Sequence, residues 1–129
     1  MTTLKQCVAA WKALDAISTQ PMDYKSAHAL VVLKARMRPH VLYFSRTEME
    51  LVEKYASHDN DGDVIYEEPG RISFKTADDM NSFARERAQL DEVELGEEIP
   101  RAKIAPPAQI TLAQLEALEP YIDVEGANV

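Results

Sequence analysis

The fold is decided by residues 23–57, which read DYKSAHALVVLKARMRPHVLYFSRTEMELVEKYAS. Apolar side chains recur there at steps of three, four or seven residues, which is the spacing of one helix face: Leu30, Leu33, Met37, Val41, Phe44, Leu51 and Tyr55. This set stays in phase across Pro39, although a proline inside a helix costs about 3 kcal/mol. Two separate helices are the alternative. The unbroken phase favours one long helix that bends at Pro39, with the proline facing solvent.

Glu48 falls in the middle of this apolar set. An unpaired charge at that place would be costly, so we expect either fraying of the helix or a partner cation beside it. A functional carboxylate is a further interpretation.

The segments on either side complete a small domain. Thr2 or Thr3 can cap a first helix with the apolar face Leu4, Val8, Trp11, Leu14 and Ile17. The short connection at 18–21 predicts that the long helix folds back antiparallel to it. Two β-prone runs at 64–66 and 71–74 predict a hairpin. Thr76 is placed to cap a helix over 77–90, followed by a short strand at 91–95, an extended segment at 101–110 and a helix from Leu112 to Leu118.

We therefore predict a mainly α protein with a small β-hairpin, of the α+β class, built on an antiparallel helical hairpin with a long Pro-kinked central helix. Residues 1–122 should form a single globular domain, with Tyr121 and Ile122 against its core. Residues 123–129 should form a mobile tail.

The charge of the chain is uneven. Its net charge is −8, but residues 1–56 hold eight Lys/Arg and five Asp/Glu, whereas residues 57–129 hold six and seventeen. This asymmetry would suit head-to-tail association or a basic partner, and it disfavours nucleic acid. No apolar run approaches the roughly 18 residues of a membrane span. Without an apolar leader, and with Cys7 as the single cysteine, we expect a cytoplasmic protein with no disulfide.

The segment 57–68 has the residue pattern of a calcium-binding loop. In an EF-hand, oxygen ligands alternate along the loop, a glycine occupies position six, and a glutamate ends it. Counting from Ser57, Gly62 is at position six, and the metal ligands would be Asp59, Asp61, Asp63 and Glu68. Pro69 and Gly70 follow at once and prevent an exit helix, so a turn leading into the hairpin explains the same letters without metal.

Catalytic groups do not gather in the sequence. The three histidines are far apart, Cys7 lies on a helix face turned towards the core, and no glycine-rich phosphate loop is present. We predict no enzyme and no organic cofactor. Basic residues cluster around the proline at 34–46, where an anion or acidic partner would fit. Tyr43 lies off the apolar stripe, beside Pro39, and is a candidate interface anchor. Arg38 is a further candidate contact residue.

Much of the chain resembles a family of short, uncharacterised proteins of tailed bacteriophages. The resemblance rests on Glu53-Lys54-Tyr55-Ala56, the turn at 59–63, the hairpin at 64–74, the acidic helix at 77–90, and Leu115, Leu118, Pro120 and Ile122. It implies a phage origin and a cytoplasmic life in an infected bacterium. It carries no activity and no functional residues.

For function, we expect a non-enzymatic protein that acts through protein–protein contacts with a host or phage protein, or with a second copy of itself. It would be either a virion or assembly factor, or an acidic anti-defence inhibitor of a host protein. In the second case the contact would be made by Asp91, Glu92, Glu94, Glu97 and Glu98. The alternative is a small-ligand or calcium-binding module that uses the 57–68 loop or the basic 34–46 segment.

Overall fold

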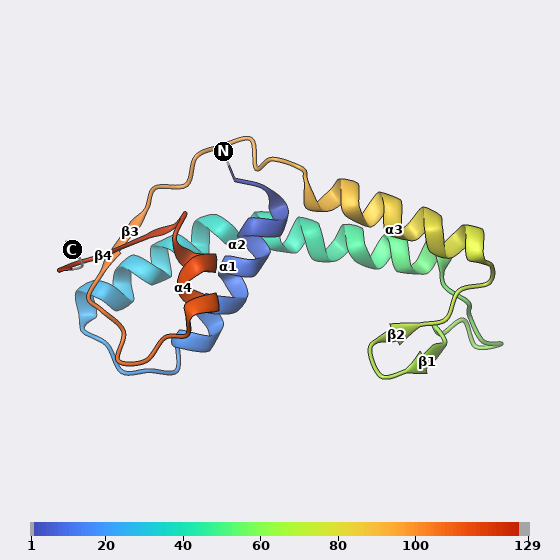
Figure 1. Cartoon of the computed structure of the whole chain (residues 1–129), viewed down its shortest axis with the longest axis horizontal. Helices are drawn as coiled ribbons and strands as arrows, with labels where there is room; N and C mark the ends of the chain where they lie inside the picture. Colours follow the sequence, from blue (N-terminus) through green and yellow to red (C-terminus); the bar gives the residue numbers. More distant parts are fainter. Residues whose placement is uncertain (1, 127–129) are drawn as a thin grey trace.

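The computed structural model describes residues 2–126. Along them the helices and strands follow in the order α1 (Leu4–Ile17), α2 (Tyr24–Tyr55), β1 (Tyr66–Glu68), β2 (Arg71–Ile72), α3 (Ala77–Asp91), β3 (Ala102–Ile104), α4 (Leu112–Leu118) and β4 (Ile122–Val124). Figure 1 shows α2 as the long axis of an elongated molecule. The expected class, mainly helical with a small β-hairpin, is confirmed.

The central element is one helix of 32 residues that passes through Pro39 without interruption. Its N-terminus is capped by Asp23, whose carboxylate accepts a hydrogen bond from the Ser26 amide at 3.2 Å. Pro39 is exposed, so the missing backbone donor lies on the solvent side. The alternative of two helices is therefore wrong, while the bend at Pro39 stays a prediction.

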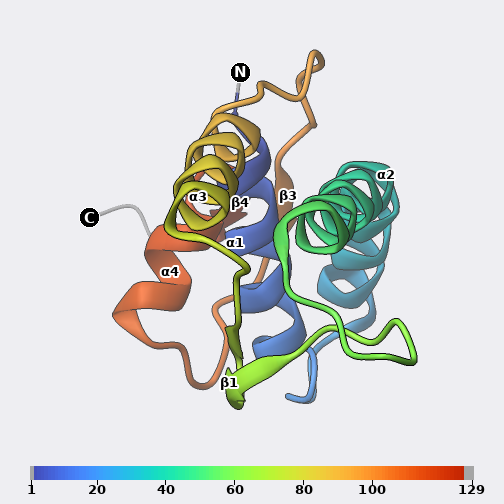
Figure 2. The same cartoon turned by 90° about the vertical axis from the view of Figure 1, so that its right-hand side faces the viewer.

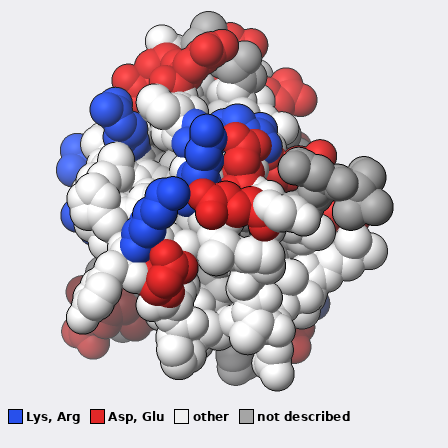
Figure 3. Space-filling view, turned by 90° about the vertical axis from the view of Figure 1, so that its left-hand side faces the viewer, with Lys and Arg blue, Asp and Glu red and all other residues white. Residues whose placement is uncertain are grey.

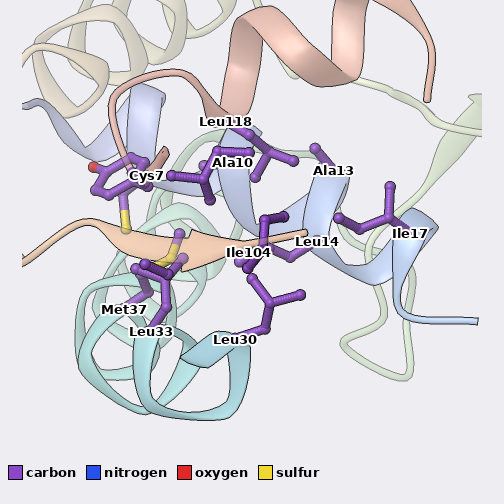
Figure 4. Packing of buried hydrophobic residues seen from close by; sticks show 13 residues of the cluster. Cys7, Ala10, Ala13, Leu14, Ile17, Leu30, Leu33, Met37, Ile104 and Leu118 are labelled. Carbon is purple, nitrogen blue, oxygen red and sulfur yellow. The ribbon is translucent and has the colours of Figure 1, made fainter. Parts of the chain in front are cut away.

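The main core lies at one end of α2. Helix α1, capped by Thr3 as expected, packs against the first half of α2 on one side and against α4 on the other. In Figure 2 the three helices lie in the order α4, α1, α2. Figure 4 shows side chains from these helices and from β3 converging on one cluster, which includes Leu14, Leu33, Met37 and Ile104.

A parallel strand pair closes this core and was not predicted. β3 pairs with β4, with Ala102 opposite Ile122 and Ile104 opposite Val124. The Glu125 amide donates to the Ile104 carbonyl at 2.8 Å, so the regular fold continues past the predicted boundary at residue 122. Residues 127–129 of the predicted tail lie outside the described residues.

The other end of α2 carries α3 and the β1–β2 hairpin (Figure 1). Helix α3 begins at Thr76, which caps it as expected, and a smaller cluster of Leu4, Phe44 and Leu90 joins α1, α2 and α3. The strand expected at 91–95 is wrong. In the part of the chain that the structure covers, this segment makes one isolated bridge, between Thr3 and Glu94. None of the described helices is long and apolar enough to span a bilayer.

Candidate interaction surface

One side of α2 is largely exposed, with the Arg38 guanidinium carbon 5.9 Å from the centroid of the Trp11 ring in α1 and Met49 lining a hollow beside the β1–β2 hairpin, and we call it the outer face of α2. It comprises Val31, Arg38, Leu42, Tyr43, Arg46 and Met49. Its four apolar or aromatic members are 53–67% exposed. Successive helix residues are rotated by about 100°, which places these positions away from the buried stripe of Leu30, Leu33, Met37 and Phe44. The helix is thus apolar on two sides, and only one of them is used by the fold.

The outer face is positively charged. The first 24 residues of α2, 24–47, hold five Lys/Arg and no Asp/Glu in a chain of net charge −8. Lys25 and Lys34 pair with Glu125 and Asp15, at 3.5 and 2.8 Å. Within residues 2–126, neither Arg38 nor Arg46 makes an ion pair, nor does their neighbour Arg36. These arginines therefore offer donors to a partner.

The end of the molecule at the left in Figure 1 has a different charge pattern. Figure 3 shows that positive and negative side chains adjoin there. The pairs Lys25–Glu125 and Arg101–Asp123 join elements at this end, with Arg101 Nε 2.8 Å from the Asp123 carboxylate. Such exposed pairs leave little net charge for a partner.

The predicted acidic contact is partly used inside the fold. Asp91 accepts a hydrogen bond from Arg87 of α3, and Glu97 lies 2.9 Å from the His40 imidazole. Glu92, Glu94 and Glu98 are exposed and have no ion pair among the residues that the structure covers. The five carboxylates therefore do not act as one free acidic surface.

Arg87 is the cation that the position of Glu48 required. Its Nε donates to the Glu48 carboxylate at 2.7 Å, and its guanidinium carbon lies 4.6 Å from the centroid of the Phe44 ring. With Asp91 as a second acceptor, one arginine joins α2 to α3. The expected partner cation is thus confirmed. The sequence did not single out Arg87, because it falls on the apolar edge of α3. The available signal was its position four residues before Asp91, the spacing of an ion pair on one helix face.

The predicted calcium ligands do not converge. One carboxylate oxygen of Asp59 accepts the backbone amides of Asp61 and Asp63 at 2.9 and 3.0 Å, which is turn chemistry. Glu68 lies in β1 and pairs with Arg71 at 3.2 Å. No group of three or more His, Cys, Asp or Glu side chains in the described chain is placed to hold a metal ion. The predicted calcium site is wrong. The loop is followed by a strand and not by the exit helix of an EF-hand, so its carboxylates serve the turn.

Cys7 lies in the core, as its position on the helix face predicted. It is fully buried, and burial raises the pKa of its thiol from 9.0 to about 11, although a hydrogen bond with Tyr121 lowers it in part. Burial also raises the pKa of Tyr121 to about 12, and its hydroxyl bonds to Thr2. A neutral, enclosed thiol is a poor nucleophile. This pair therefore belongs to the packing of the core.

Comparisons with known protein families, with curated proteins and with solved structures found no match for this chain. The resemblance to phage proteins stays a prediction.

Proposed function

We propose that this is a non-enzymatic protein that acts through protein–protein contact, and that the outer face of α2 is its contact surface. The observation that carries the proposal is an exposed helix face that combines apolar side chains with two arginines that make no ion pair within residues 2–126. Aromatic residues and arginine are enriched where proteins meet, and an exposed apolar patch costs solubility unless something covers it. Arg38 and Tyr43, named from the sequence, are both on this face.

A protein partner fits this surface better than a nucleic acid or a membrane does. Val31, Leu42 and Met49 offer no hydrogen bond to a phosphate backbone, and the net charge of −8 repels both nucleic acid and anionic lipid. A partner that presents carboxylates beside apolar side chains would satisfy both components of the face. If this chain is a phage protein, a contact of this kind would make it an assembly factor.

The acidic inhibitor is a less favoured version of the same class. Its contact would now rest on Glu92, Glu94 and Glu98, because Asp91 and Glu97 are held by Arg87 and His40. Replacing the three free glutamates with serine separates this version from the one that uses α2.

The test replaces one outer-face residue. Leu42→Asp puts a charge at the centre of the apolar surface without touching the core. Tagged wild-type and variant chains are incubated with bacterial lysate, and captured proteins, including untagged copies of this chain, are quantified by mass spectrometry. We expect Leu42→Asp to reduce the amount of specifically captured protein at least tenfold, which corresponds to a loss of about 1.4 kcal/mol in binding free energy.

A matched control makes the result interpretable. Met80→Asp introduces the same charge at a side chain of α3 that is 49% exposed, close to the exposure of Leu42. It should capture as the wild type does, and both variants should keep the wild-type circular dichroism spectrum. Equal capture by Leu42→Asp and wild type would refute the proposal.

A further inference from the structure

Helix α4 has an exposed face of the opposite chemistry. Leu112 and Leu115 are 72% and 40% exposed, although Leu118 of the same helix is fully buried against the core. Glu116 and Glu119 are exposed too. The spacing of three, four and seven residues places these four side chains on one side of the helix. We call Leu112, Leu115, Glu116 and Glu119 the outer face of α4.

The two outer faces complement each other. That of α2 has apolar side chains between arginines, and that of α4 has leucines between glutamates. Within residues 2–126, neither Glu116 nor Glu119 makes an ion pair, and the same is true of Arg38 and Arg46. In α2, Arg38 and Arg46 lie four residues before and after Leu42, so a short acidic helix would meet an apolar centre with a cation on either side.

The two faces cannot meet within one molecule. α1 packs against both α2 and α4 and separates them, as Figure 2 shows. Both outer faces are largely exposed, so neither covers the other within one molecule. A contact between them must therefore join two molecules.

We propose that the partner of the outer face of α2 is the outer face of α4 of a second copy of this chain. The inference rests on the proposed function and names its partner. Because different surfaces of the two copies meet, the contact is heterologous, and every copy keeps one free face of each kind. Repetition gives a head-to-tail row of copies, or a ring if the rotation closes. A helix of seven residues forms a small interface, so the association is weak and depends on concentration.

Pairing of two α2 outer faces is the main competing arrangement. It would bring Arg38 and Arg46 of both copies together, and α2 has no carboxylate between residues 24 and 47 to offset them. It would also leave Leu112 and Leu115 in water. The heterologous contact covers both apolar surfaces and pairs both sets of charges.

The test uses two blocked variants, Leu42→Asp for α2 and Leu115→Asp for α4. Mass is measured by light scattering after size-exclusion chromatography over a concentration series. The wild-type mass should rise above the 14.5 kDa of one chain as concentration increases, and each variant alone should stay at one chain. An equimolar mixture should form a complex of two chains and no larger species, because only one intact pair of faces remains. Met80→Asp should assemble as the wild type does.

Three results would overturn this inference. One is a wild-type chain that stays monomeric up to about 1 mM. Another is assembly lost in Leu42→Asp but kept in Leu115→Asp, which indicates pairing of two α2 faces. The third is a mixture with no two-chain complex. In each case, lysate capture that Leu42→Asp abolishes would still uphold the proposed function with a different partner. Capture and assembly both unaffected by Leu42→Asp would refute the function as well.

Discussion

The two ends of α2 are stabilised in different ways. At the first end, the helix contributes Leu30, Leu33 and Met37 to a cluster of thirteen buried side chains. The other ten come from α1, β3, α4 and β4 and from Tyr121, which directly precedes β4. At the second end, the buried cluster has three members, and a half-exposed arginine with two carboxylates supplies much of the remaining contact with α3. Burial of apolar surface is the larger stabilising contribution, so the two ends should differ in stability.

This difference also bears on the outer face of α2. The buried stripe of α2 contributes to both clusters, and the opposite side of the helix is exposed to a partner. Because the core end includes α1 and α4, the outer face of α4 and the first part of the outer face of α2 lie on the more stable part of the molecule, whereas Leu42, Tyr43 and Arg46 flank Phe44 of the smaller cluster.

The largest expected effect comes from the core end. Leu33→Ala removes a side chain that is 2% exposed and leaves a cavity between α1, α2 and β3. We expect the free energy of unfolding in urea to fall by about 2–5 kcal/mol. Val32→Ala, at the adjacent and exposed position, should change it by about 0.5 kcal/mol or less. Similar losses in the two variants would contradict the assignment of the main core to this end.

The long helix could be predicted because its evidence is local and repeated. Each buried residue of the stripe supports the same helical periodicity. Asp23, Thr3 and Thr76 lie directly before the first residues of their helices, where caps are required. The outer face was only partly anticipated, through Arg38 and Tyr43. The sequence shows apolar residues on a second side of the helix, at Val31, Leu42 and Met49. It does not say which of the two apolar sides is buried by the fold.

The remaining failures have specific physical causes. The β3–β4 pair joins Ala102 to Ile122, and three-residue strands that pair across twenty residues leave no local pattern. Arg87 could not be paired with Glu48 from the sequence, because the two residues lie 39 positions apart. The calcium site was suggested by Asp and Gly letters that turn formation uses equally well.

The second prediction concerns the smaller end. Arg87→Met removes the cation between Glu48 and Asp91 and leaves two half-buried carboxylates without a partner, at a cost of about 1–3 kcal/mol. Hydrogen exchange followed by mass spectrometry should show faster exchange in α3 while α1 is unchanged. Arg85→Met, an exposed position on the same helix, is the control and should exchange as the wild type does. Equal acceleration in α1 and α3 would show that the two ends open together.

The smallest effect is a pH dependence confined to the core end. The pKa of Cys7 is about 11 in the folded chain and 9.0 ordinarily, so between these values the unfolded chain loses a proton that the folded chain keeps. The unfolded state then binds fewer protons, and stability falls as pH rises, by about 1 kcal/mol at pH 10. Tyr121, with its pKa raised to about 12, extends the loss above pH 10.

Urea unfolding at pH 8 and pH 10 measures this loss, and Cys7→Ala is the variant that isolates its source. The alanine chain should be less stable than the wild type at pH 8, since it loses packing in the core. Its further decrease between pH 8 and pH 10 should be smaller by about 1 kcal/mol, because the titrating thiol is gone. If both chains lose the same amount, the thiol is not shielded in the way its burial implies. The alkaline sensitivity would then have to be assigned to Tyr121 or to groups outside the main core.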